Sequence, residues 1–276
     1  MNQLRIGLLQ TTTGIDPAAN ARDLEAGIAG LAGQGAHLIF TPEMSGLLDR
    51  DRVRGRASIT IEANDVALAA VRSAATAHKV WVHLGSLAVL PDAAAALPVN
   101  RGFVIDPAGT VVARYDKIHL FDVDLPSGEA IRESAGYAPG EQAVVAPLPW
   151  TILGLSVCYD VRFPPLYGAL ARAGASILSI PAAFTQPTGA AHWHVLLRAR
   201  AIETGAFVVA AAQTGTHQDG RATFGHSLVV DPWGEVLLDM GQEPGGAVLD
   251  IDLGAVAKAR GRIPALANAR VFAGPA

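Results

Sequence analysis

The chain has 276 residues, of which 50% are hydrophobic and 17% charged, and its formal net charge is −4 at pH 7. This composition is typical of a globular protein with a sizeable core, and the lack of a basic cluster argues against a nucleic-acid partner. No apolar stretch approaches the ~18 residues of a membrane span, and the first ten residues resemble a strand more than a signal peptide. A single cysteine excludes an intrachain disulfide, so we expect a cytoplasmic protein.

Predicted strands and helices alternate along the first half of the chain. A strand over residues 1–10 precedes a helix that begins at Asp16-Pro17, where Asp is a favoured N-cap and Pro a favoured first residue. The segment GAHLIFTP (35–42) contains a second short strand. A capped helix then leads into a strand at Val80–Leu84, and FVIDPAGTVVARY (103–115) predicts a hairpin around an Asp-Pro-x-Gly turn.

The second half repeats this order of elements. GASILSIP (174–181) matches GAHLIFTP and follows a helix opened by Pro164-Pro165. HWHVLLRARAIETGAFVVAAA (192–212) predicts a helix and then a strand, and LVVDPWGEVLLDM (228–240) repeats the hairpin with its turn. Each half is therefore predicted to be strand, helix, strand, helix, strand and hairpin.

This doubled pattern predicts the fold class. Strands that alternate with helices indicate βαβ units, and two similar halves favour an α/β fold with two sheets packed face to face and helices outside. A Rossmann fold is the main rival, but no G-x-G-x-x-G opens a helix after the first strand. We expect a four-layer α-β-β-α sandwich of two pseudo-repeated halves, in one domain over residues 1–276.

Three reactive side chains stand near the ends of predicted strands or hairpins, where ligands gather in α/β sheets. They are Glu43, Lys117 and Cys158. A thiol is a weak nucleophile until a neighbouring base removes its proton, a carboxylate can be that base, and an ammonium can stabilise an oxyanion. Each residue alone has an ordinary interpretation: a small buried thiol, a solvated loop glutamate and a surface lysine. The residues by themselves leave both interpretations open.

Three segments around these residues resemble the signature blocks of the nitrilase superfamily of carbon–nitrogen hydrolases. They are TPEMSG (41–46), YDKIHLFD (115–122) and GLSVCYDVRFP (154–164). The resemblance covers nearly the whole chain, and AHWHVLLRARAIET (191–204) with GHSLVVDPWG (225–234) is most similar to the Nit branch. The fold of that family is the same α-β-β-α sandwich.

The resemblance implies a role for each residue. Glu43 would be the general base, Lys117 the oxyanion stabiliser and Cys158 the nucleophile, with the N–H of Tyr159 as a second oxyanion donor. Glu133 would be a second active-site glutamate that orients the lysine and the substrate amide. The polar loop 121–140 is expected to form part of the pocket rim or a lid.

The resemblance also implies substrate contacts. Arg162 would clamp a substrate carboxylate, for which guanidinium groups are well suited, although a local pair with Asp160 is an equally weighted alternative. The neighbouring contacts would come from His119, Phe184 and Thr188. His192 and His194 are two residues apart on different faces of a helix, and no Cys or carboxylate has matching spacing, so zinc is not expected there.

The expected activity is hydrolysis of the terminal amide of a small carboxylated substrate through a cysteine thioester, without a metal or other cofactor. Deaminated glutathione is the first choice. The ω-amidase substrate α-ketoglutaramate and N-carbamoyl compounds are alternatives, and a cysteine-based redox or ligand-binding protein is the non-enzyme alternative. The expected partners are the amide substrate and, as in the family, a second copy in a homodimer or higher homo-oligomer; neither nucleic acid nor membrane is expected.

Overall fold

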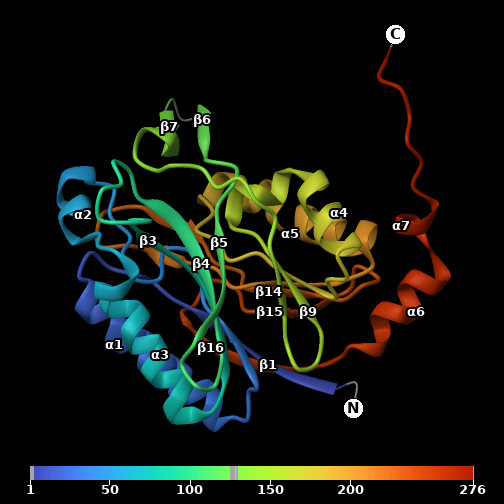
Figure 1. Cartoon of the computed structure of the whole chain (residues 1–276), viewed down its shortest axis with the longest axis horizontal. Helices are drawn as coiled ribbons and strands as arrows, with labels where there is room; N and C mark the ends of the chain where they lie inside the picture. The colour runs from blue at the N-terminus through green and yellow to red at the C-terminus, as the bar shows by residue number, and fades with distance from the viewer. Residues whose placement is uncertain (1–2, 125–127, 129, 276) are drawn as a thin grey trace.

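The computed structural model describes residues 3–124, 128 and 130–275. Two six-stranded sheets pack face to face, with helices on both outer sides (Figure 1). This arrangement is the predicted α-β-β-α sandwich.

The first sheet carries the first half of the chain and takes one strand from the end of the second half. Its strand order is β16 (Gly245–Asp252), β1 (Gln3–Gln10), β2 (Leu38–Phe40), β3 (Trp81–Val89), β4 (Val99–Ile105) and β5 (Val111–Asp116). The helices α1 (Pro17–Gly33) and α3 (Val66–His78) cover its outer face (Figure 1). The edge strand β16, antiparallel to β1, was not expected from the sequence.

The second sheet repeats this order. Its strands are β15 (Val236–Asp239), β14 (Leu228–Val230), β11 (Phe207–Ala210), β10 (Ile177–Ser179), β9 (Ile152–Leu155) and β8 (Val145–Pro147), with α4 (Pro164–Arg172) and α5 (Gln186–Thr204) outside. The series β9, β10, β11, β14, β15 has the neighbour order of β1 to β5. The predicted duplication of strand, helix, strand, helix, strand and hairpin is therefore present.

Smaller elements complete the chain. They are α2 (Arg52–Ser58), the β6–β7 hairpin (Asp122–Asp124 and Ala130–Arg132), the β12–β13 hairpin (Thr214–Thr216 and Ala222–Phe224), α6 (Gly254–Arg262), α7 (Ala265–Asn268) and the 3₁₀ turns η1 (Glu62–Asn64), η2 (Glu133–Ala135) and η3 (Cys158–Arg162). The loop expected at 121–140 thus contains β6, β7 and η2, while its residues 125–127 and 129 lie outside the described part.

Local chemistry explains where these elements begin and turn. The Asp16 carboxylate accepts hydrogen bonds from the N–H groups of Ala18 and Ala19 and so caps α1. The carboxylates of Asp106 and Asp231 each accept two backbone N–H groups of their own turn, which fixes both Asp-Pro-x-Gly hairpins.

The main hydrophobic core lies between the two sheets. It includes Leu8 and Phe40 from the first sheet and Leu155 and Val209 from the second. A second core fills the space between the first sheet and its helices α1 and α3. We infer that residues 1–276 form one domain, because side chains of both halves share the same buried layer.

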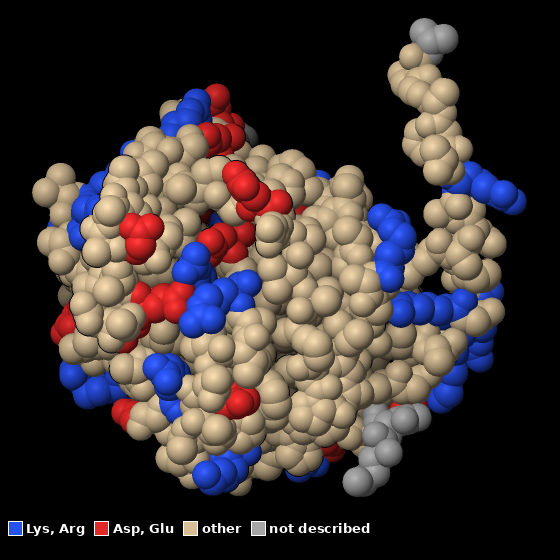
Figure 2. Space-filling view, in the orientation of Figure 1, with Lys and Arg blue, Asp and Glu red and all other residues tan. Residues whose placement is uncertain are grey.

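No helix in the described part of the chain is both long and apolar enough to cross a membrane. Acidic and basic side chains are interspersed with uncharged surface on the face shown in Figure 2.

The two halves approach closely at Gly85 in β3. A Cβ atom built there would lie 2.5 Å from the Pro42 carbonyl oxygen and 2.5 Å from Pro181 Cβ, and still nearer to the Thr41 carbonyl oxygen. Thr41 and Pro42 directly precede Glu43, and Pro181 follows β10 in the other half. Any side chain at Gly85 would therefore push the two sheets apart beside Glu43.

We expect Gly85→Ala to lower the free energy of unfolding by about 1–3 kcal/mol, since most of the clashing atoms belong to backbone and proline. The matched control is Gly30→Ala in α1, where a Cβ meets nothing within 4 Å; it should raise stability by about 0.5–1 kcal/mol. Urea unfolding of both variants measures the difference. Equal stability of the two variants would contradict a tight contact at Gly85.

Candidate active site

Three charged side chains from separate parts of the chain meet in one buried cluster. The Lys117 ammonium donates hydrogen bonds to Glu43 Oε1 at 2.9 Å and to Glu133 Oε2 at 2.9 Å. Lys117 directly follows β5, Glu43 lies three residues beyond β2, and Glu133 begins η2 after β7. The side chains of Lys117 and Glu43 are only 2% and 6% exposed, so these charges are stabilised mainly by one another and little by water.

Cys158 joins this cluster from the other sheet. Its thiol lies beside the Glu43 carboxylate, and each group shifts the pKa of the other. Cys158 lies just after β9, is 8% exposed, and its N–H donates to the Pro181 carbonyl at 2.9 Å. Its φ of +50° is in the left-handed region, a strained conformation for a residue with a Cβ. The surrounding contacts hold the sulfur in this position against that strain.

Further donors fix the two carboxylates. The Asn100 side-chain amide donates to Glu43 Oε1 at 2.9 Å and to Glu133 Oε1 at 3.3 Å. The N–H of Ala183 donates to Glu43 Oε2, and the N–H of Phe121 donates to Glu133 Oε2. Buried carboxylates need such donors because water cannot supply them. Asn100 Oδ1 is buried and has no hydrogen-bond partner among the described residues.

The pKa shifts define the protonation state of the site. Although burial opposes it, the Lys117 charge and hydrogen bonds from Cys158, Lys117 and Asn100 lower the pKa of Glu43. Burial and the negative charge of Glu43 raise the pKa of the Cys158 thiol well above its usual value. The Lys117 pKa is also raised well above normal by Glu133 and Glu43, against the effect of burial. The resting site therefore holds a carboxylate base, a neutral thiol and an ammonium.

Asp160 organises the backbone behind the thiol. Its fully buried carboxylate accepts hydrogen bonds from Tyr115 Oη at 2.7 Å, from the N–H of Val157 at 2.8 Å and from the N–H of His119 at 3.0 Å. Its Oδ1 also contacts His119 Nδ1 at 2.7 Å. The alternative in which Asp160 forms a local pair with Arg162 is therefore wrong, because other donors surround this carboxylate.

Arg162 lies among aromatic rings. Its guanidinium carbon is 5.9 Å from the Tyr159 ring centroid and 5.5 Å from that of Phe184. Both terminal nitrogens lie 3.3 Å from His192 Nδ1. Among the described residues, no carboxylate lies within ion-pairing distance of Arg162. Its charge is thus available to an anionic ligand.

The other predicted contact residues are placed as follows. The His119 ring stacks on Phe163 with a centroid distance of 3.6 Å. Phe184 is buried against Trp193 and follows Ala183, which donates to Glu43. Thr188 lies in the first turn of α5, where its hydroxyl contacts that of Thr185. His119 is thus joined to Asp160 behind the thiol, and Phe184 is the sequence neighbour of Ala183, whereas no contact among the described residues links Thr188 to the buried cluster.

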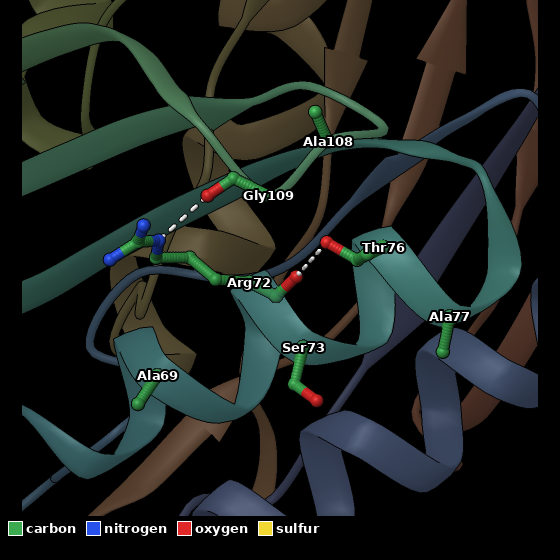
Figure 3. Close-up of a pocket in the computed structure, with 7 residues that line it drawn as sticks. All are labelled: Ala69, Arg72, Ser73, Thr76, Ala77, Ala108 and Gly109. Carbon is green, nitrogen blue, oxygen red and sulfur yellow. Dashed lines mark hydrogen bonds between the residues drawn. The ribbon is translucent and has the colours of Figure 1, made fainter.

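An open depression of about 500 Å³ lies elsewhere, between α3 and the β4–β5 turn (Figure 3). Small residues line most of it, and its one charged side chain, Arg72, donates to the Gly109 carbonyl. It contains none of the clustered acid, base or thiol groups. We therefore place the chemistry at Cys158 and not in this depression.

Sequence reasoning missed Asn100 and the role of Asp160. Asn100 lies inside β4 between Val99 and Arg101 and is fully buried. Its polar neighbour Arg101 hides the burial from the sequence, and the carboxylates that Asn100 bonds to lie 57 and 33 residues away. The partners of Asp160 are similarly remote, since Tyr115 and His119 precede it by more than 40 residues.

Comparisons with known proteins agree with this geometry. The carbon–nitrogen hydrolase family model matches residues 5–261. A deaminated glutathione amidase of Synechocystis sp. is 39% identical over 96% of this chain and 97% of its own. The Caenorhabditis elegans NitFhit structure has a TM-score of 0.89 at 35% identity, covering 98% of this chain and 66% of that one. A Nesterenkonia sp. amidase with acrylamide added at its active-site cysteine has a TM-score of 0.79 at 30% identity, covering 95% and 98%. The chain belongs to the carbon–nitrogen hydrolase family.

Proposed function

We propose that this protein hydrolyses the terminal amide of a small carboxylated substrate to an acid and ammonia, with Cys158 as the nucleophile. The observation that carries the proposal is the buried cluster in which Glu43 accepts a hydrogen bond from Lys117 and lies beside the Cys158 thiol. A thiol, a base and a cation in mutual contact provide the groups that acyl transfer needs. The acrylamide adduct of the related Nesterenkonia amidase lies on its active-site cysteine, which supports the same role here.

In the first half-reaction, Cys158 Sγ attacks the amide carbonyl carbon while its proton passes to Glu43. The carbonyl π electrons move onto oxygen, and the Lys117 ammonium with the N–H of Tyr159 stabilises this oxyanion. When the oxyanion collapses, the C–N bond breaks and Glu43 gives its proton to the leaving nitrogen. Ammonia departs and a thioester remains on Cys158.

In the second half-reaction, Glu43 takes a proton from water as the water oxygen attacks the thioester carbon. The C–S bond then breaks, the proton returns to sulfur, and the carboxylic acid leaves. One amide and one water give one acid and one ammonia. Glu43 acts as base and acid in turn, for which its position beside both the thiol and the Lys117 ammonium suits it.

Glu133 and Asn100 hold this machinery in place. Glu133 accepts two hydrogen bonds from Lys117, which fixes the ammonium beside Glu43. Asn100 bridges the two glutamates, and its unpartnered Oδ1 can accept a hydrogen bond from the N–H₂ of a substrate amide. We assign both as residues that orient the lysine and the amide.

Deaminated glutathione is the first-choice substrate for two reasons. A relative named deaminated glutathione amidase is similar over 96% of this chain, and Arg162 offers a cation to a substrate carboxylate. The amide α-ketoglutaramate and carboxylated N-carbamoyl compounds are the alternative substrates, since each also combines a hydrolysable C–N bond with a carboxylate. A redox or ligand-binding role without turnover is the non-enzyme alternative, and the raised thiol pKa argues against it, since redox-sensing thiols have low pKa values.

We also propose that the protein is a cytoplasmic homodimer. Exposed apolar side chains gather where α5 meets the β14–β15 hairpin, namely Val195, Ile202, Trp233, Val236 and Leu237. A Cβ atom built on Gly234 in the hairpin turn would lie 2.6 Å from Ile202, so the two groups are adjacent. A second copy would cover this surface. A single free thiol that must stay reduced suits the cytoplasm.

The purified protein should release ammonia from deaminated glutathione and, with a different kcat/KM, from α-ketoglutaramate. Cys158→Ala should lower kcat by at least about 10⁴-fold, as loss of a covalent nucleophile does, and should keep the far-UV circular dichroism of the wild type. A glutamate dehydrogenase assay measures the ammonia. Full activity of the folded variant would overturn the nucleophile assignment, and binding without ammonia release by the wild type would favour the non-enzyme alternative.

The pH dependence of the thiol follows from the two pKa shifts. The Glu43 pKa lies below its ordinary value of 4.5 and the Cys158 pKa lies well above 9.0, so the carboxylate–thiol pair persists between these limits. The alkylation rate of Cys158 by iodoacetamide should therefore be flat from about pH 6 to 9, whereas a free cysteine accelerates near about pH 8.5. Activity should fall only below about pH 4.5, where Glu43 gains a proton.

The control for this experiment is Glu43→Gln. It removes the base, so amidase activity should drop by about 10²–10⁴-fold, and alkylation should regain an alkaline rise. A wild-type alkylation rate that rises through pH 7 would instead show that the thiol loses its proton to solvent near that pH, and would contradict the raised pKa of Cys158.

Arg162→Met should raise KM for the carboxylated amide by about 10- to 100-fold, the loss expected for a charge-assisted hydrogen bond. For butyramide, which lacks a carboxylate, kcat/KM should stay within about twofold. Arg172→Met in α4, which removes an exposed arginine of the same type, is the matched control. Steady-state kinetics on both amides separate these outcomes, and an equal loss on both would contradict the carboxylate clamp.

A further inference from the structure

Two histidines and an aspartate meet at the surface near the outer end of the second sheet. His194 Nε2 lies 2.8 Å from Asp239 Oδ2, and His226 Nδ1 lies 2.9 Å from Oδ1 and 3.1 Å from Oδ2 of the same carboxylate. The ligand atoms of the three residues all lie within 4.8 Å of one another. We call these three residues the His-Asp-His cluster.

The cluster draws on three separate elements. His194 lies in α5, His226 in the loop before β14, and Asp239 ends β15. These residues are 13 to 45 positions apart, so a search of the sequence for metal ligands a few residues apart could not find them. His192, the neighbouring histidine of α5, contacts Arg162 and takes no part.

Surrounding contacts hold both rings. The His226 ring stacks on Phe224 with a centroid distance of 4.4 Å and an interplanar angle of 23°. The His226 carbonyl accepts a hydrogen bond from the indole N–H of Trp193, the residue before His194. The N–H of Gly241 donates to Asp239 Oδ1. The carboxylate and both imidazoles are therefore positioned in advance, as residues around a metal ligand usually ensure.

His226 also has a strained backbone. Its φ is +55°, and only three other non-glycine residues in the described part of the chain have a positive φ. Two of these, Met44 and Cys158, lie at the catalytic cluster, and the third, Lys79, caps α3. Strain in a residue with a Cβ is retained mostly where a fixed side-chain position matters.

We propose that the His-Asp-His cluster binds a divalent transition metal of the Zn²⁺ class. Two imidazole nitrogens and one carboxylate oxygen form a ligand set that suits Zn²⁺ and Co²⁺ better than it suits Mg²⁺ or Ca²⁺. Tetrahedral Zn²⁺ with bonds of about 2.0–2.2 Å separates its ligand atoms by about 3.4 Å. Small side-chain rotations reach that spacing from the present one. The fourth position is left to water.

Metal binding at this site must displace protons. Asp239 is an acceptor when ionised, so each imidazole nitrogen that faces it carries a hydrogen. For the metal to bind, that hydrogen has to leave or move to the other nitrogen of the ring.

The site would be structural and not catalytic. A metal there would tie α5 to the β14–β15 hairpin, close to the apolar surface that we assign to the dimer. It also lies behind Trp193, which packs on Phe184 at 4.8 Å next to the thiol site. The amide chemistry at Cys158 does not require it.

The experiment titrates ZnCl₂ into the chelator-treated full chain by isothermal calorimetry, with all proteins carrying Cys158→Ala to remove the competing thiol. The reference protein should bind one Zn²⁺ per chain. His194→Gln and Asp239→Asn should each weaken binding at least tenfold, and His78→Gln, which alters an exposed histidine at the end of α3, should leave it unchanged. Co²⁺ should give the visible absorption of a tetrahedral site in the reference protein and in His78→Gln only.

Melting temperatures show whether a loss of Zn²⁺ binding comes from misfolding of the variant. Asp239→Asn keeps the size of the side chain and one hydrogen-bond acceptor, so its melting temperature without metal should stay close to that of the reference protein. Zn²⁺ should raise the melting temperature of the reference protein and not of this variant. Equal Zn²⁺ affinity of the reference protein and both cluster variants, or no saturable binding by the reference protein up to about 1 mM, would overturn the proposal.

Discussion

The active site depends on one buried ammonium shared between two carboxylates. Burying a charged group away from water costs free energy unless an opposite charge lies beside it and other groups complete its hydrogen bonds. Lys117 meets this condition for Glu43 and Glu133 at once, with Asn100, Ala183 and Phe121 supplying the other donors. Two negative charges around one positive charge leave the cluster anionic. Burial and this excess keep the nearby thiol neutral, and in the mechanism that we propose the thiol proton therefore passes to Glu43 during the attack.

The doubled fold explains how these groups meet. Glu43 follows the second strand of the first half, whereas Cys158 follows the first strand of the second half, so the pseudo-repeat does not superimpose them. They come together because the two sheets pack face to face with these strand ends at a common edge. Gly85 permits that approach, since any side chain there would collide with the residues that precede Glu43 and with Pro181. The packing of the sheets and the chemistry of the site thus share one contact.

Most of the fold was predictable because its signals are local. The N-cap at Asp16, the apolar period of α1 and the two Asp-Pro-x-Gly turns all act within a few residues. The edge strand β16 was not, because its pairing with β1 joins the two ends of the chain. Within the site, the resemblance supplied Glu43, Lys117, Glu133 and Cys158. It did not supply Asn100, which stands beside the charged Arg101 in its strand and whose carboxylate partners are remote in the chain.

The placement of Asp160 explains why Arg162 keeps its charge for a ligand. The two residues are neighbours in sequence, and a free carboxylate at this distance would pair with the guanidinium. Asp160 instead points inward, where hydrogen bonds from Tyr115, Val157 and His119 use both of its oxygens. Arg162 is left over the rings of Tyr159 and Phe184, which are the sequence neighbours of Cys158 and Ala183. The substrate that we propose would place its amide at the hydrogen-bonding groups around Glu43 and its carboxylate at the Arg162 guanidinium.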